Sequence, residues 1–169
     1  LLAAIECREA IPPLIEWLRG PEDRSRFATN LLRFLEAETE PGFRDWLIEQ
    51  VQHGHDQQFI HASNALLETG VAPRQHIAAL LARLSRQGQV RTDRHEIGPR
   101  IMILCATRAE CARTAEETLE SLESRAAWLV ARWLLGVGRS TSHIARIYVD
   151  GVLKLGPAER TDWLISGLQ

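Results

Sequence analysis

The sequence predicts an all-α fold, a right-handed α-solenoid in which about five helix pairs stack within a single domain over residues 1–169. Three observations support this prediction. Apolar residues recur every three or four positions, and no segment requires the strict alternation of a strand. Glycine, proline and capping residues divide the chain into short segments. Finally, the apolar pattern of residues 15–32 returns in residues 48–67, which indicates an internal repeat.

The first helix pair is expected between Pro12 and Leu35. Leu14, Ile15 and Leu18 fall on one helical face, and Gly20-Pro21 ends that helix. A second helix can be capped by Asp23 or Ser25. Its apolar residues follow helical spacing and form a stripe that must be buried: Phe27, Leu31, Leu32, Phe34 and Leu35.

The second pair repeats this order. Pro41 is placed to open its first helix, residues 53–55 are expected to form the turn, and Asp56 is expected to cap the following helix. The residues predicted to face the core are apolar and recur with helical spacing: Phe43, Trp46, Leu47, Val51, Phe59, Ala62, Leu66 and Leu67. Equivalent positions in the two pairs are 33 or 34 residues apart.

Later segments follow the same template with looser boundaries. Helices are predicted over 77–88, within 97–109, and over 112–122, 124–136, 143–156 and 157–168. Residues 87–100 lack helical apolar periodicity, so they are expected to form a loop, either a linker or a binding loop. Since one pair cannot bury its apolar face alone, successive pairs must stack and share an elongated core.

The stretch AIPPLIEWLRGPEDRSRFATNLLRFL, residues 10–35, resembles a HEAT repeat. It has a proline-containing first helix, a short turn, and a second helix that carries Arg26, Ala28 and three leucines. The resemblance covers residues 10–69 clearly and the remainder by periodicity. Glycine stands at 20 and 54, where the family usually has aspartate, so a neighbouring class such as the tetratricopeptide repeat stays an alternative. The resemblance implies a surface that binds protein on the concave face lined by second helices.

Composition narrows the class of protein. A net charge of −2 and a pI near 6.3 provide no global field that would attract nucleic acid or an anionic membrane. Cys7, Cys105 and Cys111 have no CxxC spacing, which argues against a disulfide framework or zinc knot and favours a cytoplasmic location. No apolar run approaches the ~18 residues that cross a bilayer. The chain begins at Leu1 without methionine, so we expect that it can be part of a longer protein.

One column of residues, spaced by 34, is a candidate binding surface: Asn30, Asn64, Gly98, Arg132 and Ser166. Arg132 stands in an otherwise apolar helix, where its guanidinium must reach solvent, a carboxylate or a partner. The column either forms an internal polar ladder or lines the concave groove. The full set of predicted partner-binding residues is Arg26, Asn30, Arg33, His61, Asn64, Arg100, Trp128 and Arg132.

Tryptophans and histidines are two further kinds of candidate site residue. Trp128 and Trp133 are five residues apart and cannot both face one seam, so one of them is a candidate for an exposed interface residue. His53, His55 and His61 lie near one turn, but such a turn is typical of solvated loops, and no metal site is expected. No nucleophile, zinc-hydrolase or phosphate-loop motif is present, so no catalytic residue and no cofactor are predicted.

The function predicted from these observations is an interaction scaffold that binds a protein partner on the concave face. A first alternative is nucleic-acid binding, which requires five arginines to converge into one positive stripe: Arg26, Arg33, Arg100, Arg132 and Arg160. A second alternative is a lyase or chaperone that holds a small ligand, which an apolar pocket near Trp128 and His143 would favour. Neither partner identity nor oligomeric state follows from the sequence.

Overall fold

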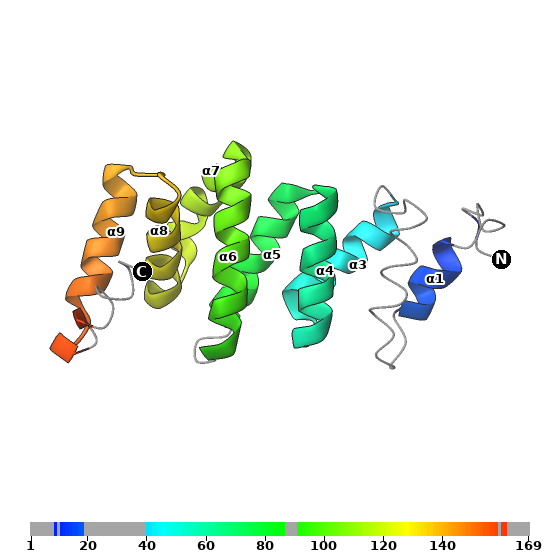
Figure 1. Ribbon diagram of the computed structural model, residues 1–169, viewed down its shortest axis with the longest axis horizontal. Helices are drawn as coiled ribbons and strands as arrows, with labels where there is room; N and C mark the ends of the chain where they lie inside the picture. The colour runs from blue at the N-terminus through cyan, green and yellow to red at the C-terminus, as the bar shows by residue number, and fades with distance from the viewer. Residues whose placement is uncertain (1–8, 10, 19–39, 87–90, 159, 162–169) are drawn as a thin grey trace.

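The computed structural model describes residues 9, 11–18, 40–86, 91–158 and 160–161 (Figure 1). Throughout these residues the secondary structure is helical and contains no strand, which confirms the all-α prediction for this part of the chain. The elements are α1 (Ile11–Leu18), α3 (Pro41–His53), α4 (Asp56–Thr69), α5 (Pro73–Arg86), α6 (Arg91–Thr107), α7 (Ala109–Thr118), the 3-10 turn η4 (Leu119–Ser121), α8 (Ser124–Gly136) and α9 (Ser142–Leu153).

Helix boundaries fall at the proline, glycine and capping residues of the sequence. Pro41 and Pro73 open α3 and α5, where a missing N–H costs little. Gly70 ends α4 in the left-handed conformation, with φ of 67°. The prediction that Asp56 caps α4 was wrong by one residue. His55 occupies the cap position, and its backbone N–H donates to Gln58 Oε1 at 3.2 Å, because Gln stands three residues after the cap as in a capping box.

The loop predicted over residues 87–100 is wrong for residues 91–100, and residues 87–90 lie outside the described residues. From Arg91 onward this segment is helical and belongs to α6. The buried stripe of α6 starts only at Ile97 and continues through Ile101, Leu104 and Cys105. Residues 91–96 are polar in the sequence, so the first turns of the helix carry no apolar periodicity that could reveal them. Pro99 lies inside the helix and is exposed.

The helices form two rows. Contacts join α3 to α5 and α5 to α7 in one row, and α4 to α6 and α6 to α8 in the other. Contacts between α3 and α4, α5 and α6, and α7 and α8 connect the rows. The elements follow one another along the long axis of the molecule (Figure 1). At the end of this arrangement α9 packs mainly against α8, so it does not extend the row of α3, α5 and α7.

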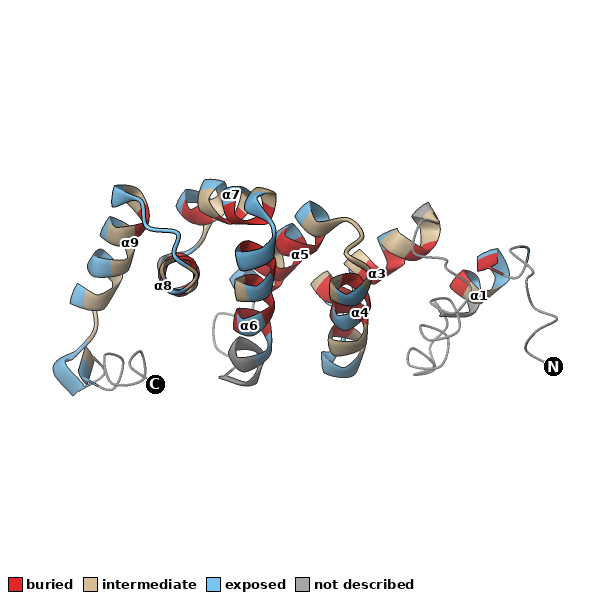
Figure 2. Cartoon of the chain, turned by 45° about the horizontal axis from the view of Figure 1, so that its top comes forward, coloured by how far each residue is buried: buried red, intermediate tan, exposed pale blue. Residues whose placement is uncertain are grey.

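Buried residues lie where the helices of the two rows face each other (Figure 2). The core prediction for the second pair is confirmed, since Phe43, Trp46, Leu47 and Phe59 are all at most 2% exposed. Val51, Ala62 and Leu66 are also buried, and Leu67 is half-buried. Burial of a large apolar side chain contributes about 1.5–3 kcal/mol, so the interface between the rows supplies the main stabilisation.

Candidate functional site

Arg100 is a buried arginine that joins α6 to α4. Its Nη1 donates to the backbone oxygen and to Oε2 of Glu96, each at 2.6 Å, and its Nη2 donates to Asn64 Oδ1 at 2.9 Å. The guanidinium carbon lies 5.3 Å from the centroid of the Phe59 ring. Because Arg100 is 8% exposed, the surface here is formed by Asn64 and Glu96, and Arg100 holds them in place from below.

An exposed strip of α4 and α6 lies above this arginine. It consists of the exposed Asn64 and the half-buried His61 on α4 together with the exposed residues Glu96, Pro99 and Ile103 on α6, and we name it the α4–α6 ridge. The three α6 residues are spaced by three and four positions and therefore share one face of the helix. Ile103 is 50% exposed, one of three large apolar side chains that stand out among the described residues. The ridge thus combines an apolar side chain with polar groups that are already ordered.

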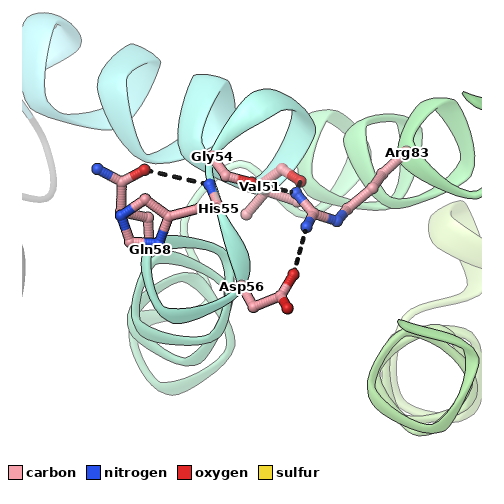
Figure 3. A network of polar contacts seen from close by, with 6 residues as sticks. All are labelled: Val51, Gly54, His55, Asp56, Gln58 and Arg83. Atoms are coloured by element: carbon pink, nitrogen blue, oxygen red, sulfur yellow. Dashed lines mark hydrogen bonds and ion pairs between the residues drawn. The ribbon is translucent and has the colours of Figure 1, made fainter. Parts of the chain in front are cut away.

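Arg83 makes a second arginine contact, and this residue is not among the predicted site residues (Figure 3). Its Nη1 donates to the backbone oxygens of Gly54 at 2.6 Å and Val51 at 3.5 Å, and its Nη2 lies 3.4 Å from Asp56 Oδ1. The carbonyls at the end of α3 carry partial negative charge, so the cation is stabilised there. Arg83 is 4% exposed and lies over Phe59, 4.4 Å from the ring centroid. The signal in the sequence was that Arg83 is the one charged residue in the apolar stretch IAALLARL, residues 77–84 of α5.

His76 is a buried histidine between α5 and α4. Its Nε2 lies 2.8 Å from Ser63 Oγ, and both residues have no exposed surface. Burial, assisted by the positive charge of Arg100, lowers the pKa of His76 to about 3. The imidazole is therefore neutral at physiological pH and serves the packing of the two helices.

A pocket of about 450 Å³ opens between η4, α8 and α9. The pocket lies where α9 packs on α8, beside η4. We name it the wedge pocket. Such a volume lies within the range of small-molecule sites. The lining residues are Leu119, Glu120, Leu122, Arg125, Ala127, Trp128, His143, Arg146, Ile147, Asp150, Gly151, Lys154 and Leu155.

Trp128 is one of the residues that line the wedge pocket. Its indole stacks on the ring of Tyr148, with centroids 6.4 Å apart and an interplanar angle of 15°. The same indole presses on the backbone of α9 at Gly151, where an added Cβ would lie 2.2 Å from the ring. Glycine is therefore required at 151 for α9 to approach α8 this closely. Trp128, predicted as an interface residue, is 3% exposed and part of this packing.

The rim of the wedge pocket carries charged side chains. His143 Nε2 lies 3.7 Å from Glu120 Oε1. Arg125, Arg146 and Lys154 are exposed, and none of them forms an ion pair within the described part of the chain. The three cations therefore outnumber the two lining carboxylates, although the whole chain has a net charge of −2.

The other predicted site residues do not assemble into one group. Arg26, Asn30 and Arg33 lie outside the described residues. Arg132 is half-buried on α8, where its neighbour Trp133 is half-buried against Gly98 of α6. Of the repeat column, Asn64 is exposed and accepts a hydrogen bond from Arg100, which is not a member of the column, whereas Ser166 also lies outside the described residues.

Two described cysteines, Cys105 and Cys111, are free thiols buried in the core. Burial raises the pKa of Cys105 to about 12 and that of Cys111 to about 11, so both remain protonated thiols in the core. His53 contacts Arg86 across α3 and α5. Within the described ranges no three His, Cys, Asp or Glu side chains are grouped so that they could hold a metal ion.

In the part of the chain that the structure covers, no helix combines the length and the apolar character needed to span a bilayer.

Comparisons of the chain with protein-family models, with curated proteins and with solved structures found no match.

Proposed function

We propose that this chain is an interaction scaffold, a HEAT-like α-solenoid that binds a protein partner along the α4–α6 ridge. The supporting arrangement is the pair of rows described above, in which α4, α6 and α8 are the second helices of successive pairs. In a helical-repeat array, the row of second helices forms the extended binding face.

The observation that carries the proposal is the exposure of Ile103 beside polar groups that Arg100 already orders. Burial of an apolar side chain in an interface makes the free energy of binding more favourable. Neighbouring side chains that are already ordered lose little conformational entropy when the partner binds. Asn64 Oδ1 accepts from Arg100, which leaves the amide N–H groups of Asn64 for an acceptor on the partner. Glu96 supplies acceptors for a donor. The ridge therefore fits an apolar side chain flanked by peptide donors and acceptors.

The nucleic-acid alternative gains less support from the arginines. Arg100 is buried beneath the ridge. Arg160 Nη2 donates to the backbone oxygens of Leu153 and Leu155, each at 3.1 Å, and so caps the end of α9. These two guanidinium groups are engaged within the protein and are not presented to a phosphate backbone.

Affinity capture from the native cell with matched variants tests the proposal. Ile103→Asp removes the apolar anchor, and Val149→Asp is the control because Val149 is also 50% exposed but lies on α9. A partner protein should be retained by the wild type and the control. Its affinity for Ile103→Asp, measured with the purified partner by calorimetry, should be at least tenfold weaker, as expected for a hot-spot residue.

Two results would contradict the proposal. One is a partner that binds Ile103→Asp as tightly as the wild type. The other is capture that disappears after nuclease treatment and falls steeply with salt, which would indicate nucleic acid as the partner.

A further inference from the structure

We infer that the wedge pocket is a binding site for a small amphipathic carboxylate, with an apolar body on Trp128 and an anionic head between Arg125 and Lys154. This inference is independent of the protein-binding ridge. It rests on the shape of the pocket, the register of α8 against α9, and the charges on the rim.

The register of the two helices brings the two cations together. A short connection, residues 137–141, joins α8 to α9, so the chain reverses between them, and the two helices pack against each other at an angle (Figures 1 and 2). Trp128 lies against Gly151. Arg125 stands three residues before Trp128 on α8, and Lys154 stands three residues after Gly151, directly after the end of α9. Because the chain direction reverses between the two helices, both residues lie toward the same end of the pocket that they line.

The other charges that line the pocket do not cancel those of Arg125 and Lys154. Glu120 and His143 are 3.7 Å apart and belong to the opposite end, near the start of α9. Asp150 is one helical turn before Lys154 and Arg146 is one turn before Asp150, so these side chains alternate in sign along α9. The end that contains Arg125 and Lys154 thus has an excess of positive charge, which complements one carboxylate.

The floor of the pocket selects an apolar body. Leu119, Leu122, Ile147 and Leu155 line it together with the indole of Trp128. About 450 Å³ accommodates a medium-length alkyl chain or a flat ring system. A fully hydrated anion such as inorganic phosphate would leave this apolar surface unfilled, so an amphipathic ligand fits better.

Calorimetric titration with decanoate, decanol and decylamine provides the test. Decanoate should bind with one site per chain, more tightly than decanol, while decylamine should bind most weakly. Shortening the chain from decanoate to octanoate should weaken binding by about fourfold per methylene if the tail enters the pocket. The double variant Arg125→Gln/Lys154→Gln should bind decanoate about tenfold more weakly and decanol unchanged.

The matched control is Arg113→Gln/Arg139→Gln, which removes two exposed cations outside the pocket and should leave all affinities unchanged. Equal affinity for decanoate and decanol, preference for decylamine, or absence of saturable binding would overturn the inference. These comparisons use the wild-type protein, so they decide the question even if the double variant does not fold. Ile103→Asp should bind decanoate normally, which separates failure of this site from failure of the ridge.

Discussion

Replacement of His76 by glutamine should flatten the dependence of stability on pH in mildly acidic solution. In the folded protein burial lowers the pKa of His76 to about 3, whereas the unfolded chain has the ordinary value of 6.5. Between these two values the unfolded state binds a proton that the folded state does not. Stability from the neutral imidazole is therefore complete above pH 6.5 and is lost progressively as the pH falls towards 3.

The slope in this window is about 1.4 kcal/mol per pH unit. His76 should thus reduce the free energy of unfolding by about 2 kcal/mol between pH 6.5 and pH 5. Urea unfolding followed by circular dichroism at pH 7.5, 6.5, 5.5 and 5.0 measures this quantity for the wild type and for His76→Gln. Carboxylates titrate in both proteins, so the difference between the two slopes isolates the histidine.

Ser63→Ala provides the control for the hydrogen bond. This variant removes the partner of His76 but keeps the imidazole buried, and burial is the larger cause of the low pKa. Its overall stability should fall by about 1 kcal/mol while the steep slope persists. If wild type and His76→Gln lose stability in parallel down to pH 5, the argument that His76 is kept neutral by burial is wrong.

Two further variants test contacts between helices by chemical denaturation. Arg83→Met should cost about 2–4 kcal/mol, because the carbonyls at the end of α3 lose a buried cationic donor, whereas the exposed Arg86→Met should change stability by less than about 0.5 kcal/mol. Gly151→Ala should cost about 1–3 kcal/mol, since its Cβ would lie 2.2 Å from the ring of Trp128. Gly136→Ala meets no atom within 4 Å and should be neutral or stabilising.

Either comparison can fail in an informative way. If Arg83→Met and Arg86→Met are equally stable, the donation from Arg83 to the end of α3 contributes nothing net. If Gly151→Ala matches the wild type, α8 and α9 can separate without cost. The wedge pocket would then lack a fixed shape.

Apolar spacing was sufficient to predict the helices and their buried faces in the second pair. Phe43, Trp46 and Phe59 are buried because each falls on a stripe that recurs with helical period. The same criterion failed for the start of α6, where residues 91–96 have no apolar member to mark a face. Apolar periodicity detects the part of a helix that faces the core. A helix end that carries only polar residues therefore cannot be detected by it.

Polar contacts within the site were harder to predict than the core. Asn64 and Arg100 are both predicted partner-binding residues, but their pairing depends on the approach of α4 to α6, which joins positions 36 residues apart. Arg83 contacts Gly54, 29 residues away, for the same reason. The wedge pocket depends on how α9 departs from the rows, and no local pattern encodes that angle. Sequence identifies which side chains need partners, and tertiary packing decides which partners they find.

A helix that packs mainly against one neighbour can unfold locally while the rest of the protein stays folded. In the described part of the chain α9 packs chiefly on α8, whereas α5 is enclosed by α3, α4, α6 and α7. Local opening releases amide protons to solvent without global unfolding, so hydrogen–deuterium exchange should be fast in α9 and slow in α5. A molecule bound between α8 and α9 would slow hydrogen exchange in α9 selectively. Binding would then order this end of the protein in addition to making contacts with it.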